Sequence, residues 1–258
     1  MNVVCVQTAA VWEDKAASHA RVNALLDAAA IAPGSLVLLP EMFATGFSMN
    51  VPAIAEDAGG PTHRFLAEQA VGRGVNILGG VVGRTPDGRG RNQAVLFSPD
   101  GRELLRYQKL QPFSLGGEAH NYEAGREIVT IDLGGLIVCP FICYDLRFPE
   151  IFREAACRRG ATLFLVIAAW PRPRDFHWKT LLAARAIENQ ASVAAVNHCG
   201  ADPTVTYFGG SRILDPKGET LAEAGSEPGA IHADVDVGVV EKWRQDFPAL
   251  RDARKIRG

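Results

Sequence analysis

The sequence has little of what marks disulfide-rich, membrane-spanning or nucleic-acid-binding proteins. Five cysteines in 258 residues are an odd number and form no Cys-x-x-Cys pair, which argues against a disulfide framework or a zinc site and favours a reducing compartment. The net charge of −2 gives no electrostatic reason to expect nucleic acid or a membrane surface as partner. The longest apolar run, residues 161–170, is too short to cross a bilayer.

The first residues favour a cytoplasmic location. Residues 3–7 read as a strand, and no basic segment followed by an apolar one precedes them, so we expect no signal peptide. The composition, 47% hydrophobic and 22% charged, is that of an ordinary globular protein with enough apolar residues for a substantial core.

Apolar strand-like segments alternate with helical patterns, and Gly and Pro separate them. No repeat or linker breaks this pattern, so we expect one α/β domain over residues 1–258, with a mixed sheet and helices on the outer faces. The predicted strands cover residues 3–7, 36–39, 76–82, 92–97, 103–107, 128–132, 136–139, 163–168, 192–197, 210–214, 219–222 and 230–235. The predicted helices cover residues 15–30, 61–72, 150–159 and 176–190, and one begins near 237. A charged tail, residues 251–258, is either loosely held or docked on another subunit.

The stretch Leu136 to Pro149 combines a buried strand, a thiol and a helix start. An apolar run leads into Cys143, the sequence turns polar directly after it, and Pro149 opens the predicted helix 150–159. A thiol between a strand and a helix sits on a sharp turn with backbone N–H groups beside it, which is a nucleophile elbow with sulfur in place of oxygen. By itself the stretch also fits a buried structural cysteine.

Two other ionisable residues follow predicted strands. Glu41 comes after the short apolar strand 36–39, and Lys109 comes after the strand 103–107. Because strand ends on one edge of a sheet lie close together, we expect the fold to bring Glu41, Lys109 and Cys143 into one site.

These three groups predict acyl transfer. Glu41 can take the proton of the thiol and later give it to a leaving amine. Lys109 suits a developing oxyanion, and the backbone N–H of Tyr144 is a natural second donor. Cys143 would attack an amide carbonyl, ammonia would leave, and water would hydrolyse the thioester. This chemistry requires no metal and no organic cofactor.

The segments around these residues resemble a known family. Leu-Pro-Glu-Met-Phe holds Glu41, Tyr-Gln-Lys-Leu holds Lys109, and Ile-Cys-Tyr-Asp-Leu-Arg-Phe-Pro holds Cys143. In this order they are similar to the Glu-Lys-Cys triad of the nitrilase (carbon–nitrogen hydrolase) superfamily, and the resemblance spans residues 3 to about 247. It implies a single carbon–nitrogen hydrolase domain built as a four-layer α-β-β-α sandwich. It also implies homodimers or larger homo-oligomers that pair sandwiches into an αββααββα block.

The same resemblance suggests a second glutamate near the lysine. The segment from Glu118 to Gly125 is similar to the family loop that carries this residue. We place the role on Glu118, as a carboxylate that orients Lys109, with Glu123 as the competing candidate.

Trp170-Pro171, His177-Trp178 and the segment 185–190 look like the ω-amidase branch, which hydrolyses 2-oxoglutaramate and 2-oxosuccinamate to 2-oxo acids and ammonia. Such substrates carry a carboxylate that needs a cation, and Arg147 can supply a bidentate fork. A structural ion pair is the alternative role for Arg147. Phe43 and Trp170 are expected to wall the pocket.

Other interpretations stay open on the sequence alone. The same chemistry could serve deaminated glutathione, an N-carbamoyl amino acid or another small amide, and the same fold could be a catalytically silent scaffold. A Cys–His dyad would need His120 or His177, and a redox sensor would need Cys139 close to Cys143. We expect the cysteines other than Cys143 to lie in the core.

Overall fold

The computed structural model describes residues 1–253, so the end of the predicted charged tail, residues 254–258, lies outside the described residues. The strands are β1 (Asn2–Gln7), β2 (Leu36–Leu38), β3 (Asn76–Arg84), β4 (Gly90–Phe97), β5 (Glu103–Gln108), β6 (Ile131–Leu133), β7 (Leu136–Ile142), β8 (Leu163–Ala168), β9 (Ser192–Asn197), β10 (Cys199–Ala201), β11 (Thr206–Phe208), β12 (Arg212–Leu214), β13 (Thr220–Glu223) and β14 (Gly229–Asp234). The helices are α1 (Lys15–Ala28), α2 (Val51–Ile54), α3 (Pro61–Arg73), α4 (Glu118–Asn121), α5 (Pro149–Arg158), α6 (Asp175–Asn189), α7 (Val237–Asp246) and α8 (Ala249–Asp252). Short 3₁₀ helices cover Ser114–Gly116, Cys143–Arg147 and Arg172–Arg174.

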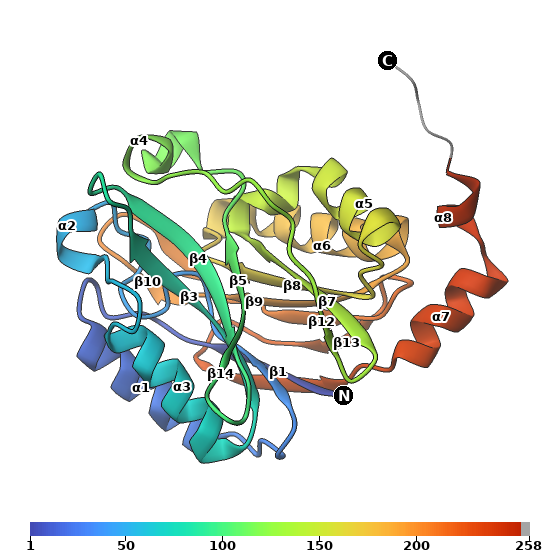
Figure 1. The fold of residues 1–258 in the computed structure, drawn as a ribbon, viewed down its shortest axis with the longest axis horizontal. Helices are drawn as coiled ribbons and strands as arrows, with labels where there is room; N and C mark the ends of the chain where they lie inside the picture. The colour runs from blue at the N-terminus through green and yellow to red at the C-terminus, as the bar shows by residue number, and fades with distance from the viewer. Residues whose placement is uncertain (254–258) are drawn as a thin grey trace.

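Two six-stranded sheets form the centre of the molecule. One has the order β14-β1-β2-β3-β4-β5 and the other β13-β12-β9-β8-β7-β6. Helices α1 and α3 lie on one side of the strands, and α5 and α6 lie on the other (Figure 1). This arrangement confirms the predicted four-layer α-β-β-α sandwich.

The alternation of side chains along β1 explains the layers. Val3 and Cys5 belong to the core shared with the second sheet, whereas Val4 and Val6 belong to a separate cluster with residues of α1 and α3. Successive side chains of a strand point to opposite faces, so a strand covered on both faces is apolar throughout. The wholly apolar β2 and β8 follow the same rule.

Strand direction determines which loops meet. β1, β2 and β3 are parallel, and β4 is antiparallel to both β3 and β5, so β5 runs in the direction of β2. In the other sheet β7, β8 and β9 are parallel. The carboxyl ends of β2 and β5 therefore share one edge of their sheet, and those of β7, β8 and β9 share one edge of the other.

The structure departs from the sequence-based expectations in several places: β6 covers Ile131–Leu133 where a strand over residues 128–132 was predicted, and the helices α2, α4 and α8 were not predicted. β7 extends to Ile142, three residues beyond its predicted end, and brings the strand directly to Cys143. The hairpin of β10 and β11 was not predicted, because Gly200, Asp202 and Pro203 are typical of loops. The prediction that Cys157 lies in the core is wrong, because this residue faces solvent.

Glu56 links two helices of the outer layer on the first sheet. Its buried carboxylate accepts hydrogen bonds from the backbone N–H of Thr62 at 2.8 Å and from the Thr62 hydroxyl, in the first turn of α3. It also pairs with Lys15 of α1 at 3.2 Å. Burial raises the pKa of Glu56, but the nearby His63 ring, the hydrogen bonds from Thr62 and the charge of Lys15 outweigh burial and lower the pKa to about 2.

We expect Glu56→Gln to lower the free energy of unfolding by roughly 2 kcal/mol at pH 7, after allowance for solvent screening. Because the pKa is lower in the folded state, this stabilisation is present above about pH 4.5 and is lost as the pH falls towards 2. Urea titrations of wild type and variant between pH 2.5 and pH 7 measure the difference. Glu68→Gln, at an exposed position on α3, is the matched control. A difference that does not change with pH would contradict the assignment.

Candidate active site

Three predicted catalytic residues lie at the strand ends of both sheets. Glu41 follows β2 by three residues, Lys109 directly follows β5, and Cys143 directly follows β7. The site therefore lies where the carboxyl ends of the two sheets meet, and the structure brings the three residues together as the sequence predicts.

Cys143 occupies a sharp turn. Its φ of 47° is in the left-handed region that non-glycine residues rarely adopt. It opens the 3₁₀ helix Cys143–Arg147, and α5 begins at Pro149. A strained backbone at a strand-to-helix turn is typical of a nucleophile held out of the core, because only strong surrounding contacts maintain it.

The ammonium group of Lys109 lies between two buried carboxylates. Nζ donates to Oε1 of Glu41 and to Oε2 of Glu118, each at 2.8 Å. The Lys109 side chain is 1% exposed and both glutamate side chains are 0% exposed. Buried charges are stable only when they are paired and their remaining oxygens are hydrogen-bonded.

Neutral donors complete this charge cluster. Asn92 Nδ2 donates to Oε1 of Glu41 at 2.6 Å and to Oε1 of Glu118 at 2.8 Å. The backbone N–H of Ala169 reaches Oε2 of Glu41 at 2.9 Å, and that of Phe113 reaches Oε2 of Glu118 at 2.6 Å. Each carboxylate oxygen thus accepts at least one hydrogen bond, and the cluster is fixed from four segments of the chain.

The geometry distinguishes between the two candidates for the second glutamate. Glu118 contacts Lys109 directly, whereas Glu123 pairs with Arg91 at 2.8 Å and its side chain is 30% exposed. Glu118 is therefore the carboxylate that can orient the lysine.

The electrostatics of the site assign different protonation states to the sulfur and the amine. Burial and the negative charge of Glu41 raise the pKa of the Cys143 thiol well above its usual range, and the charge of Lys109 only partly offsets this. Burial alone lowers the pKa of Lys109, but Glu118 and Glu41 raise it further than burial lowers it. The resting site thus holds a neutral thiol, an ammonium and a carboxylate that can act as a base.

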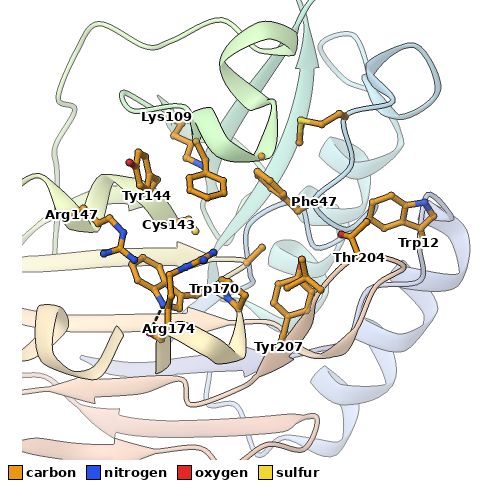
Figure 2. A pocket seen from close by; sticks show the side chains of 16 residues that line it. Trp12, Phe47, Lys109, Cys143, Tyr144, Arg147, Trp170, Arg174, Thr204 and Tyr207 are labelled. Atoms are coloured by element: carbon orange, nitrogen blue, oxygen red, sulfur yellow. Dashed lines mark hydrogen bonds between the residues drawn. The ribbon is translucent and has the colours of Figure 1, made fainter. Parts of the chain in front are cut away.

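A cavity of about 330 Å³ opens onto Cys143 and Lys109 (Figure 2). This volume is at the small end of the range for ligand pockets. Its wall is formed by Trp12, Phe47, Met49, Lys109, Phe113, Gly116, Cys143, Tyr144, Arg147, Ala169, Trp170, Pro171, Arg174, Thr204, Val205 and Tyr207.

Arg147 lies in the cavity wall without a carboxylate partner. Its guanidinium group is 4.6 Å from the centre of the Trp170 ring and 3.4 Å from His177 Nδ1, and no Asp or Glu of residues 1–253 pairs with it. Burial and the neighbouring charge of Arg174 lower its pKa. The structure therefore gives no support to the structural ion pair, the alternative role considered for Arg147.

Arg174 was missed by the sequence-based prediction. It lies beside Trp170 in the same wall (Figure 2), and its guanidinium group is 5.6 Å from the centre of the Phe113 ring. No carboxylate of the described part of the chain pairs with it. The available signal was a second arginine in the segment that follows β8.

The two predicted wall aromatics differ in position. Trp170 is in the wall, and Asn197 holds its backbone, accepting from Trp170 N at 2.7 Å and donating to Trp170 O at 3.1 Å. The expectation for Phe43 is wrong: this side chain is 0% exposed and packs in the core against His19 and Phe65. Phe47, four residues later, reaches the cavity instead.

Neither rival mechanism finds support in the described residues. His120 and His177 are exposed, and neither hydrogen-bonds to Cys143. Cys139 is fully buried, and all five cysteines are free thiols. Cys5 and Cys199 are also buried, as predicted.

Two further features concern metal ions and membranes. Within residues 1–253, no three His, Cys, Asp or Glu side chains are grouped so that they could hold a metal ion. In the same range, no helix combines the length and apolar character needed to cross a membrane.

Comparison with known proteins gives concordant matches. The family model described as carbon-nitrogen hydrolase matches residues 2–245. The chain is 39% identical over 262 residues to the protein named omega-amidase YafV of Yersinia enterocolitica, covering 99% of this chain and 98% of that protein. It is 36% identical over 221 residues to the 2-oxoglutaramate amidase of Bacillus subtilis, covering 85% of each.

A solved structure shares the fold over the whole chain. XC1258 from Xanthomonas campestris, described as a CN-hydrolase superfamily protein with an arsenic adduct in the active site, superposes with a TM-score of 0.91 and is 36% identical. The match covers 100% of this chain and 98% of that one.

The charge cluster predicts opposite effects of Glu41→Gln on thiol acidity and on amide hydrolysis. Loss of the carboxylate removes the base, so amide turnover should fall by about 10²–10⁴-fold. Loss of its negative charge beside the sulfur should lower the pKa of the Cys143 thiol.

The pH dependence of iodoacetamide alkylation at Cys143, followed by peptide mass spectrometry, measures the thiol pKa of wild type and variant. Glu123→Gln, which removes a carboxylate outside the cluster, is the control. An unchanged or higher thiol pKa in Glu41→Gln would contradict this electrostatic description.

Proposed function

Because the chain belongs to the carbon–nitrogen hydrolase family, and is thus a hydrolase of carbon–nitrogen bonds in linear amides, we propose that its substrate is the terminal amide of a small 2-oxo acid. In this proposal it converts 2-oxoglutaramate or 2-oxosuccinamate to the 2-oxo acid and ammonia. The observation that carries the proposal is a cavity lined by a thiol, by an ammonium that the Glu41 carboxylate binds, and by two guanidinium groups that have no acidic partner among residues 1–253.

The first half of the proposed reaction forms a thioester. The Cys143 sulfur adds to the amide carbonyl while Glu41 takes the thiol proton. Lys109 and the backbone N–H of Tyr144 stabilise the oxyanion of the tetrahedral intermediate. The carbon–nitrogen bond then breaks, and Glu41 gives its proton to the leaving nitrogen, which departs as ammonia.

The second half reverses the roles of the same groups. Glu41 takes a proton from water, the hydroxide adds to the thioester carbonyl, and the oxyanion occupies the same position as before. Collapse of this intermediate breaks the carbon–sulfur bond, and the thiolate of Cys143 recovers its proton. Glu118 keeps Lys109 oriented through both halves.

A carboxylate on the substrate explains why two arginines lie in the cavity wall. Two neighbouring guanidinium groups without an acidic partner repel each other, and a bound carboxylate removes this cost. The Trp170 ring contacts the Arg147 guanidinium group through a cation–π interaction. We assign the carboxylate of the substrate to Arg147 and Arg174, and the names of the Yersinia and Bacillus relatives agree with this choice.

Two further properties belong to the same proposal. We propose that the chain forms one domain and acts as a homodimer or larger homo-oligomer in the cytoplasm. Phe176 and Ile187 on α6 are 73% and 55% exposed, and five free thiols suit a reducing compartment. Light scattering of the purified protein measures the assembly, and a monomer at micromolar concentration would contradict it.

The activity is tested by ammonia release from a panel of amides. We expect 2-oxoglutaramate to give the highest kcat/KM, and deaminated glutathione and N-carbamoyl amino acids to give lower values. Cys143→Ala should abolish turnover, since no other described thiol lies in the cavity. A higher kcat/KM for an amide without a carboxylate would overturn the substrate assignment and leave the amidase chemistry intact.

Arg147→Ala should lower kcat/KM for 2-oxoglutaramate by about 10–100-fold, because a charge-assisted hydrogen bond contributes about 1.5–3 kcal/mol. The loss should be mainly in KM, since the arginine holds a group remote from the reacting carbonyl. Hydrolysis of a neutral amide of similar length is the control and should change little. Arg172→Ala, at an exposed arginine of the 3₁₀ helix Arg172–Arg174, is the matched variant. Equal losses for charged and neutral amides would refute the role of Arg147.

A further inference from the structure

Asp145 is a buried carboxylate that the proposed reaction does not use. Its side chain is 0% exposed, and no Lys, Arg or His of residues 1–253 forms an ion pair with it. Burial raises the pKa of Asp145 to about 7, so holding a carboxylate here costs stability. A polar group in such a position requires a specific reason.

Three donors from two chain segments converge on this carboxylate. Oδ2 accepts from the Tyr107 hydroxyl at 2.7 Å and from the backbone N–H of Ile142 at 2.9 Å. Oδ1 accepts from the backbone N–H of Gln111 at 2.9 Å. All three partners present hydrogen to the aspartate. This set of donors fits an acceptor on both oxygens.

These partners flank the two catalytic residues in the chain. Tyr107 and Gln111 lie two residues before and two residues after Lys109, and Ile142 directly precedes Cys143. β5 belongs to the first sheet and β7 to the second, so the hydrogen bonds of Asp145 cross between the sheets at the edge that holds the site.

The contact with Ile142 also bears on the strained turn. This hydrogen bond joins Ile142 and Asp145, which lie on either side of Cys143 in the chain. The Cys143 φ of 47° is stable only if these neighbours are fixed. Without this bond, the turn can relax towards an ordinary conformation and carry the sulfur with it.

We propose that Asp145 is a positioning residue that fixes the Cys143 sulfur relative to the Lys109 ammonium by tying the segment after β5 to the turn after β7. It touches neither the substrate nor the reacting atoms. The inference rests on the proposed roles of Lys109 and Cys143, and it adds the element that sets the distance between them.

Asp145→Asn is the main variant, because asparagine has the same shape but accepts with one atom and donates with the other. Its amide nitrogen must face at least one of the three donors, so at least one of the three bonds is lost. We expect kcat to fall by about 10²-fold, the loss that a displacement of about 1 Å produces, while KM stays close to the wild-type value.

The pH midpoint of iodoacetamide alkylation at Cys143 should change if Asp145 positions the sulfur, and should stay the same if Asp145 only stabilises the fold. Lys109 lowers the thiol pKa and Glu41 raises it, so a sulfur that loses the ammonium while it stays beside the carboxylate titrates at higher pH. Removal of a negative charge alone would shift the alkylation midpoint to lower pH. An alkylation midpoint that moves to higher pH in Asp145→Asn therefore indicates a displaced sulfur, whereas one that moves to lower pH indicates only the loss of a negative charge.

Tyr107→Phe is the second variant, since it removes one donor and keeps the charge of Asp145. We expect a smaller fall in kcat and a midpoint shifted in the same upward direction. If Asp145→Asn does not fold, this variant decides: unchanged kcat and midpoint would overturn the proposal.

Leu26→Ala, a buried position on α1, is the control for lost stability. It should lower Tm without moving the alkylation midpoint or kcat. The proposal is overturned if Asp145→Asn behaves like Leu26→Ala, or if its midpoint moves down at unchanged kcat. A wild-type protein that neither alkylates at Cys143 nor hydrolyses any amide of the panel would instead overturn the proposed function.

Discussion

The buried ammonium of Lys109 is the constraint on which the site depends. An amine with 1% exposure remains charged only because Glu41 and Glu118 each contact it at 2.8 Å. The carboxylates in turn depend on Asn92 and on backbone N–H groups. The segments after β2, β5 and β8 and the strand β4 must therefore take their places together, so the contacts that set the catalytic geometry also hold the fold together.

The cavity separates two tasks between its two sides. One side holds the sulfur and the ammonium, with the carboxylates bound behind that ammonium, and this group can exchange a proton and stabilise a negative oxygen. The other carries the guanidinium group of Arg147 against the Trp170 ring and that of Arg174 near the Phe113 ring. Because the arginines lack acidic partners in the described part of the chain, they remain available to an anion. Chemistry and recognition can thus be altered separately.

The sequence was sufficient for the order of the main strands and for the three residues that follow β2, β5 and β7, since apolar runs, Pro and Gly report local structure directly. It was insufficient wherever side-chain direction decides. Phe43 and Phe47 are four residues apart in one irregular loop, and only the fold turns the first into the core and the second into the cavity. Arg174 and the hairpin of β10 and β11 depend on how loops pack, and two of the three donors of Asp145 come from a segment more than thirty residues away.

The composition of the charge cluster also affects how a reaction cycle ends. One ammonium in the cavity wall and the two buried carboxylates bound to it give this cluster a surplus of one negative charge. A neutral amide meets no repulsion there, whereas the acid formed from it carries a new negative charge at the same position. On the proposed mechanism, like-charge repulsion then weakens the hold on the product. Release of the anionic product would therefore be favoured, and the site would be free for the next uncharged amide group.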